Sequence, residues 1–184
     1  MVTTAQWVAY RYAERAMLRA PLPSASDAGG GWRSVELRRH LPLDQLDMLV
    51  AETARKVGAA LAIASDDAGF SYVVASDEEG SEARLVLDPD AAAGSDAGRE
   101  ALARADAETK ASDRWRRRSA RAFAEWSAAT PSAIDDRQVA EVMSGDRQVD
   151  AIADLVGALG VRLPEAHPPS HTELHEVARV QAPS

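Results

Sequence analysis

The chain contains no cysteine. This absence excludes a disulfide framework, a thiolate zinc site and a cysteine nucleophile. The sequence also lacks a run of about 18 apolar residues, and its first residues do not follow the order of charged, apolar and small residues that marks a secretion signal. We therefore expect a cytoplasmic protein that does not enter a membrane.

Lysine is nearly absent as well. Lys56 and Lys110 are the only lysines and the other basic residues are arginines, while alanine is abundant. This usage is typical of GC-rich bacterial coding sequences, so we do not interpret it as a functional adaptation.

The length of 184 residues suits one domain with a substantial core. A chain of this size buries roughly two thirds of the surface that it exposes when unfolded. We expect a single α+β domain over residues 1–163, in which the sheet occupies about residues 32–89 and helices occupy about residues 99–160. The remaining residues, 164–184, are expected to form a flexible or short-helical tail.

The best-specified stretch is a helix followed by a strand meander. Between residues 43 and 57, apolar side chains recur at spacings of three and four, which predicts a helix with one buried face, and Gly58 is suited to end it. Three short apolar runs follow, at 61–63, 70–74 and 83–87, and turns rich in Asp and Gly separate them. This pattern predicts antiparallel hairpins.

The N-terminal side is expected to add a helix and one more strand. Thr3-Thr4-Ala5-Gln6 matches the capping box of a helix start, so we predict a helix to about Arg19. Residues 32–40 alternate in polarity as a strand does. With the helix at 43–57 as a crossover, this strand would lie parallel to the run at 61–63 and complete a four-stranded mixed sheet.

The remaining segments predict a connector and a helical C-terminal half. Residues 21–31 are rich in Pro, Ser and Gly and predict a flexible connector. Residues 99–129 contain neither Pro nor Gly and predict one long helix, and Asp136 and Asp146 are suited to cap two shorter helices after it. We expect these helices to pack on one face of the sheet.

Negative charge is concentrated in the meander. Residues 59–100 carry 2 basic and 10 acidic groups, and the whole chain has a net charge of −8. The turns and strand ends hold the six acids that we expect to bind a basic protein partner, namely Asp66, Asp67, Asp77, Glu78, Glu79 and Glu82. The simpler alternative is a solvated surface, and neither turn keeps the ligand spacing of a calcium loop. The net charge opposes binding to nucleic acids.

Four arginines share one face of the predicted long helix. They are Arg114, Arg117, Arg118 and Arg121. Guanidinium groups bind phosphates and tryptophans stack on bases, so this face, with Trp115 and Trp126 on the same helix, is a candidate site for an anionic ligand. The alternatives are ion pairs within the chain, for example with Asp113 or Glu125, and a protein partner.

Two histidines near the C-terminus have the spacing of metal ligands. His171 and His175 would project from one face of a helix one turn apart, as paired imidazole ligands do. Pro168 and Pro169 exclude His167 from the same helix, and the nearby glutamates do not match the zinc-protease pattern. We expect no other cofactor, and the alternative for these histidines is a solvated tail.

The sequence contains no catalytic motif that we can assign. The run Gly29-Gly30-Gly31 lacks the residues of a phosphate-binding loop, and there is no Gly-x-Ser-x-Gly elbow, so an enzyme is disfavoured. We expect a small acidic protein-binding module, such as an immunity-like inhibitor or adaptor. One alternative is an enzyme or ligand-binding domain that uses the arginine face for an anionic small molecule. The other is a structural or oligomerisation subunit that associates through Trp7, Tyr10 and Tyr12.

Overall fold

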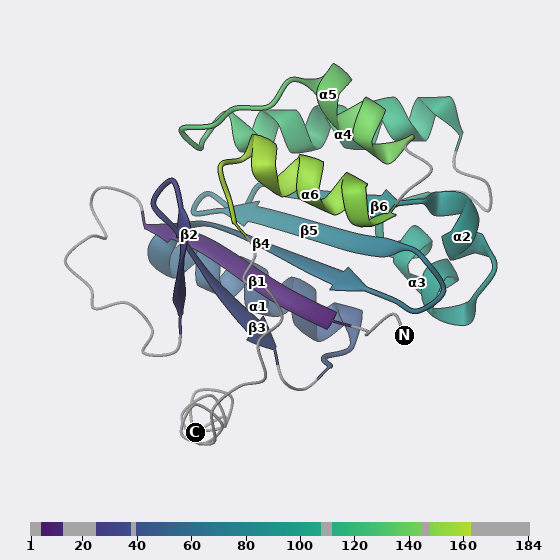
Figure 1. Ribbon diagram of the computed structural model, residues 1–184, viewed down its shortest axis with the longest axis horizontal. Helices are drawn as coiled ribbons and strands as arrows, with labels where there is room; N and C mark the ends of the chain where they lie inside the picture. The colour runs from purple at the N-terminus through teal and green to yellow at the C-terminus, as the bar shows by residue number, and fades with distance from the viewer. Residues whose placement is uncertain (1–4, 13–24, 38–39, 108–111, 145–147, 163–184) are drawn as a thin grey trace.

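Six strands form one sheet, and every pairing in it is antiparallel among the residues that the structure describes. The computed structural model describes residues 5–12, 25–37, 40–107, 112–144 and 148–162. The strands lie in the order β2-β3-β1-β4-β5-β6 (Figure 1). Their bounds are β1 Ala5–Tyr12, β2 Ser26–Gly29, β3 Trp32–Leu37, β4 Gly58–Ser65, β5 Ser71–Asp77 and β6 Glu82–Leu87. The expected α+β class is confirmed, whereas the expected four-stranded sheet is wrong.

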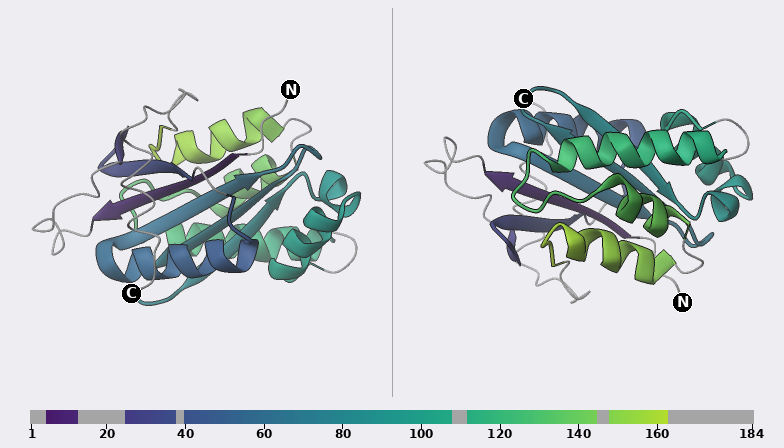
Figure 2. Two further views of the ribbon diagram at one scale, coloured as in Figure 1. Left: turned by 90° about the horizontal axis from the view of Figure 1, so that it is seen from below. Right: turned by 90° about the horizontal axis from the view of Figure 1, so that it is seen from above.

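Helices cover both faces of the sheet. One face carries α1 (Leu43–Val57), as the periodicity predicts, and the other carries α4 (Asp113–Ser127), α5 (Asp136–Met143) and α6 (Gln148–Ala158). Two short helices, α2 (Pro89–Ala93) and α3 (Asp96–Arg104), lie at the end of the sheet where β6 finishes (Figures 1 and 2). The helices that follow the sheet in sequence therefore pack mainly on the face opposite α1.

The first described segment is a strand, so the predicted N-terminal helix is wrong. β1 lies between β3 and β4, near the middle of the sheet. Val8, Ala9 and Tyr10 are all buried because both faces of β1 are covered. Aromatic and β-branched residues suit such a strand better than a helix. A strand buried on both faces shows no alternation of polarity, which is the signal that would have revealed it.

Gln6, which the sequence presents as part of a helix cap, instead ties β1 to the segment before α1. Its Nε2 donates to the carbonyl oxygen of Leu41 at 2.9 Å, and its Oε1 accepts from the amide nitrogen of Leu41 at 2.8 Å. Gln6 is buried, so this pairing satisfies polar groups that water does not reach.

The crossover through α1 is present, but the two strands that it joins are not neighbours. β3 and β4 each pair antiparallel with β1, so they run in the same direction on either side of it. The expected parallel pair is therefore wrong, because β1 occupies the place between its two members.

The expected flexible connector at residues 21–31 is wrong in its second half. Ser26–Gly29 forms the edge strand β2, and the glycines that follow take left-handed φ angles in the turn to β3. The amide nitrogen of Arg162 donates to the carbonyl oxygen of Ala28 at 2.6 Å. The end of the described C-terminal segment therefore covers part of the β2 edge.

The expected long helix over residues 99–129 is two helices. α3 ends before Asp106, which takes the left-handed conformation with φ of 52°. α4 begins after Ser112, whose hydroxyl oxygen accepts a hydrogen bond from the amide nitrogen of Trp115. Aspartate enters the left-handed region more readily than most residues, so the chain breaks here without Gly or Pro.

The two shorter helices are present, with starts that differ from the prediction. Asp135 and not Asp136 caps α5, because its Oδ1 accepts from the amide nitrogen of Gln138 at 2.8 Å. Asp146 lies outside the described residues, and α6 is described from Gln148. Gly160, with φ of 71°, follows the end of α6 as expected.

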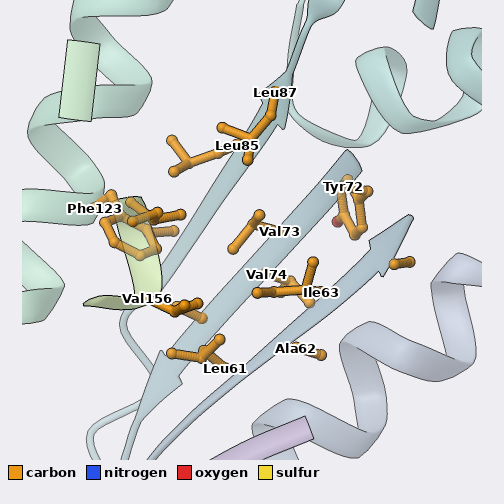
Figure 3. Packing of buried hydrophobic residues seen from close by; sticks show 14 of the residues in the cluster. Leu61, Ala62, Ile63, Tyr72, Val73, Val74, Leu85, Leu87, Phe123 and Val156 are labelled. Atoms are coloured by element: carbon orange, nitrogen blue, oxygen red, sulfur yellow. The ribbon is translucent and has the colours of Figure 1, made fainter. Parts of the chain in front are cut away.

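The two faces of the sheet have different side chains because they carry different helices. On the α1 face β4 contributes only alanines, Ala60, Ala62 and Ala64, and this permits close approach of the helix. On the opposite face larger side chains fill the space under α4 and α6. They include Leu61, Ile63, Val73, Leu85, Phe123 and Val156 (Figure 3).

Candidate functional site

The six candidate acids do not form one surface, because they lie at two ends of the sheet. Asp66 and Asp67 belong to the turn between β4 and β5, whereas Asp77, Glu78 and Glu79 belong to the turn between β5 and β6. The two turns are joined by β5, whose 7 residues span roughly 20 Å in an extended strand (Figure 1). A single small partner segment cannot cover both turns at once.

Two of these acids hold the turns together. The Oδ1 of Asp66 accepts from the amide nitrogen of Ala68 at 2.8 Å. The Oδ1 of Asp77 accepts from the amide nitrogens of Glu79 at 3.0 Å and Ser81 at 2.8 Å. These bonds fix the turn backbones, so the acids without such a role are the exposed Asp67, Glu78 and Glu79.

Glu82 belongs to a different group of charges, the Asp47 cluster, which joins α1, α3, β5 and β6. Its members are Asp47, Tyr72, Glu82, Arg84, Glu100 and Arg104. The hydroxyl of Tyr72 donates to Asp47 Oδ1 at 2.8 Å. Asp47 Oδ2 contacts Arg104 Nη1 at 3.3 Å and Arg84 Nε at 3.4 Å, the latter without the alignment of a hydrogen bond. Arg84 also contacts Glu82 at 2.6 Å.

The pKa values of Tyr72 and Arg84 in this cluster are both raised. Burial raises the pKa of the Tyr72 hydroxyl above its ordinary value, and the charge of Asp47 and the hydrogen bond to it raise that pKa further. Burial acts to lower the pKa of Arg84, but the Tyr72 oxygen and the carboxylates of Asp47 and Glu82 outweigh it, so that pKa is also raised. Groups that hold their protons this firmly are not suited to acid–base catalysis near neutral pH.

Sequence reasoning missed the role of Asp47, although a signal was available. Asp47 also suits the positive N-terminal end of α1, and that interpretation alone does not reveal a buried partner. It lies three residues before Val50 and seven before Ala54, and both of these are fully buried on the core-facing side of α1. An acid at a core position of a helix requires a partner, so this spacing predicts a buried ion pair.

A half-open pocket lies at the tip of the β5–β6 hairpin. Its volume is about 200 Å³, and its lining comprises Arg11, Gly58, Ala59, Asp77, Glu78, Glu79 and Ala129. We call Asp77, Glu78 and Glu79 the hairpin tip, and the hollow beside them the tip pocket. Its lining comes from β1, from the junction of α1 with β4, from the hairpin and from the end of α4. Only the folded chain brings these segments together.

Two helices end at the tip pocket. Gly58 caps α1, and Ala129 follows the last turn of α4. The carboxyl end of a helix carries a partial negative charge, which favours cations. The last turn of α1 contains Arg55 and Lys56, which offset that charge, whereas the last turn of α4 contains no basic residue. The end of α4 therefore lacks the basic residues that offset this partial charge at the end of α1.

Arg11 is the one basic residue in the lining of the tip pocket. Its side chain is half-buried, and its Nε is enclosed without a hydrogen-bond partner in the described part of the chain. Arg11 forms no ion pair with Asp77, Glu78 or Glu79, and the structure describes all three of these acids. The guanidinium of Arg11 therefore does not neutralise the three carboxylates, and the net charge of the pocket lining is negative.

The four candidate arginines lie on the solvent face of α4, as the spacing predicts. Arg114, Arg117, Arg118 and Arg121 are exposed. Arg118 Nη2 donates to the carbonyl oxygen of Asp106 at 2.9 Å, and Arg121 Nε donates to Glu125 at 2.8 Å. We call these four residues the arginine face.

The arginine face has no aromatic platform. Trp115 is 3% exposed and its Nε1 donates to the carbonyl oxygen of Ala105 at 2.7 Å. Trp126 is 2% exposed and packs between Trp32 and Phe123, with ring centroids 6.3 Å and 5.1 Å away. Neither tryptophan is available to stack on a base, so the structure does not support the stacking that the sequence allowed as one candidate.

The expected histidine pair, His171 and His175, lies outside the described residues. Within the described residues, no group of three or more His, Cys, Asp or Glu side chains is arranged to hold a metal ion. In that same part of the chain, no helix combines the length and the apolar composition needed to cross a membrane.

Comparisons with protein-family models, with curated proteins and with solved structures found no match for this chain.

Proposed function

We propose that this chain is a small protein-binding module that receives a basic side chain of a partner protein in the tip pocket. The observation that carries the proposal is the lining of that pocket. It combines three carboxylates with the uncompensated carboxyl end of α4. Lysine and arginine side chains carry the complementary charge on a long stem that reaches into a hollow.

The size of the tip pocket favours a side chain over a free small molecule. Sites for drug-sized ligands have volumes of about 300–1,000 Å³, and the tip pocket has about 200 Å³. The net charge of −8 adds long-range attraction for a basic partner and accelerates encounter. The proposed surface is narrower than the one expected from the sequence, because Asp66 and Asp67 lie at the far end of β5 and Glu82 is engaged by Arg84.

The alternative of an enzyme or anion-binding domain with a site between the sheet and α4 has less support. Phe123 and Trp126 of α4 and Leu85 of β6 are buried in that space, and they leave an apolar, filled junction. The structural-subunit alternative relied on exposed aromatic residues, but Tyr10 is 1% exposed and Trp7 is partly buried. The side chain of Tyr12 lies outside the described residues.

Titration with a short oligolysine peptide, followed by amide NMR shifts, tests the proposal. We expect the largest shifts at Gly58, Ala59, Ala129 and the hairpin tip at low ionic strength, because these groups surround the tip pocket. The shifts should weaken as the screening length falls from about 30 Å at 0.01 M salt to about 8 Å at 0.15 M. Equal shifts around Asp67 and the tip would show only non-specific attraction and would contradict the proposal.

A further inference from the structure

Within the described residues, only two of the four residues of the arginine face, Arg118 and Arg121, make contacts that hold the fold together. Arg114 and Arg118 are four residues apart on α4, as are Arg117 and Arg121, and like charges at this spacing destabilise a helix slightly. Arg114 and Arg117 are exposed and form no ion pair or side-chain hydrogen bond with any described residue. Arg116, between them, is by contrast engaged by Asp113 at 3.7 Å and Asp90 at 4.0 Å.

The chain's own hairpin tip is too far away to neutralise the free part of this face. Ala129 lines the tip pocket. At 1.5 Å a residue along a helix, Arg117 lies about 18 Å and Arg114 about 22 Å from Ala129. Both distances exceed the screening length of about 8 Å at physiological salt. Among the described residues, the hairpin tip therefore does not neutralise Arg114 and Arg117, and a second molecule can supply that negative charge.

The chemistry of the arginine face favours carboxylates on a protein. A single-stranded nucleic acid gains much of its affinity from base stacking, and both tryptophans of α4 are buried. A net charge of −8 repels polyanions such as nucleic acid. An exposed protein turn with adjacent carboxylates needs no base stacking, and guanidinium groups pair with carboxylates in a two-pronged geometry.

The chain itself presents such a turn. Glu78 and Glu79 are exposed, adjacent and free of ion pairs with described residues, and they lie at the opposite end of α4 from Arg114. We propose that the arginine face of one copy binds the hairpin tip of a second copy, through Arg114 and Arg117. This inference rests on the proposed function, because it identifies the basic side chains that bind the tip as those of the arginine face on another copy of the same chain.

The contact joins two different surfaces, so it is a head-to-tail association. It has a specific consequence for charge reversal. A tip-reversed variant, Glu78→Lys/Glu79→Lys, carries two basic surfaces, and a face-reversed variant, Arg114→Glu/Arg117→Glu, carries two acidic ones. Neither variant presents complementary surfaces to a second copy of itself. The acidic tip of the face-reversed variant, however, remains complementary to the basic face of the tip-reversed variant.

The substitutions spare the contacts that maintain the fold. Asp77 keeps its turn hydrogen bonds, and Arg118 and Arg121 keep theirs. The matched control is Glu52→Lys/Asp67→Lys, which makes the same change in net charge at two exposed positions away from the tip. A second control, Arg114→Lys/Arg117→Lys, preserves the charge of the face.

Sedimentation velocity of the full chain at about 0.01 M ionic strength, where the screening length is about 30 Å, tests the inference. We expect the wild type and both controls to self-associate reversibly. In each reversed variant the affinity of self-association should be at least about tenfold lower. An equimolar mixture of the two reversed variants should form a 1:1 complex. Far-UV circular dichroism of each variant shows separately whether it is folded.

Two results would overturn the inference. One is a wild-type chain that stays monomeric at low ionic strength, and the other is a mixture of reversed variants that does not associate although the wild type does. Neither result decides the proposed function, because the oligolysine titration reports on the tip of a monomer. Failure of that titration with intact self-association would instead contradict the tip pocket as a site for basic side chains.

Discussion

The hydroxyl of Tyr72 donates a hydrogen bond of 2.8 Å to Asp47, and this bond joins the buried strand β5 to α1. The same carboxylate contacts Arg84 and Arg104, so one acid connects four elements of the fold. Asp47 is 9% exposed. A charge so enclosed is tolerated because each of its oxygens has a partner.

Replacement of Asp47 by Asn removes the charge that holds the two arginines but keeps an oxygen for Tyr72. We expect the free energy of unfolding to fall by about 1–3 kcal/mol, less than for a fully buried pair because both arginines are partly exposed. Urea unfolding at unchanged slope measures the loss. The control is Asp44→Asn, an exposed acid in the first turn of the same helix. The Asp47 interpretation fails if the control loses as much stability.

Replacement of Tyr72 by Phe changes how stability depends on pH. The pKa of Tyr72 is raised in the folded chain, first by burial and then by Asp47. Folded Tyr72 therefore keeps its proton above about pH 10, where an unfolded tyrosine loses it. The contribution that protonated Tyr72 makes to the free energy of unfolding is therefore complete below about pH 10. Above that pH it falls by up to about 1.4 kcal/mol per pH unit. Wild-type stability should decline more steeply than that of Tyr72→Phe in alkaline urea titrations, and parallel curves would contradict the prediction.

The alanine face of β4 should not tolerate a large side chain. Ala62 is fully buried on the face that carries α1. We expect Ala62→Leu to lower the free energy of unfolding by about 1–3 kcal/mol, because overpacking forces the helix away from the sheet. Ile63→Leu, on the opposite face of the same strand, keeps its volume and should cost less than about 1.5 kcal/mol. A lower unfolding midpoint for Ile63→Leu than for Ala62→Leu would contradict this packing.

Two helical glycines should respond in opposite directions to replacement by alanine. A Cβ at Gly98 would lie 2.0 Å from the carbonyl oxygen of Ala92, a backbone atom that cannot move aside. We expect Gly98→Ala to cost about 2 kcal/mol or more as α2 and α3 separate. A Cβ at Gly157 meets no atom within 4 Å, so Gly157→Ala should gain about 0.5–1 kcal/mol from helix propensity. Thermal unfolding of the two variants distinguishes these outcomes.

The sequence predicts elements well where apolar residues recur at helical spacing or form short runs between turns rich in Asp and Gly. α1 and the hairpins of β4, β5 and β6 follow from the spacing of apolar residues and from Asp–Gly turns. β1 was missed because its apolar run, unlike those of β4 and β5, does not lie between turns rich in Asp and Gly, and because the Thr3 to Gln6 pattern was mistaken for a helix cap. The break between α3 and α4 was missed because Asp106, and not a glycine, takes the left-handed conformation.

The candidate site was predictable only in part, for a reason of topology. Glu78 and Glu79 stand out in the sequence as acids of a turn. The tip pocket also needs Arg11, Gly58 and Ala129, which come from distant parts of the chain and carry no common pattern. The separation of Asp67 from the tip depends on the length and direction of β5, which the acidic composition of the meander does not reveal.

The most direct test of the central claim is native mass spectrometry of the tagged chain, purified gently from its own host at low ionic strength. The tip-reversed variant Glu78→Lys/Glu79→Lys and the control Glu52→Lys/Asp67→Lys are purified in parallel. The account predicts a basic protein or a second copy bound to the wild type and to the control, released by salt and missing from the tip-reversed variant. The same complex on the tip-reversed variant, or a bare chain in all three samples, would contradict it.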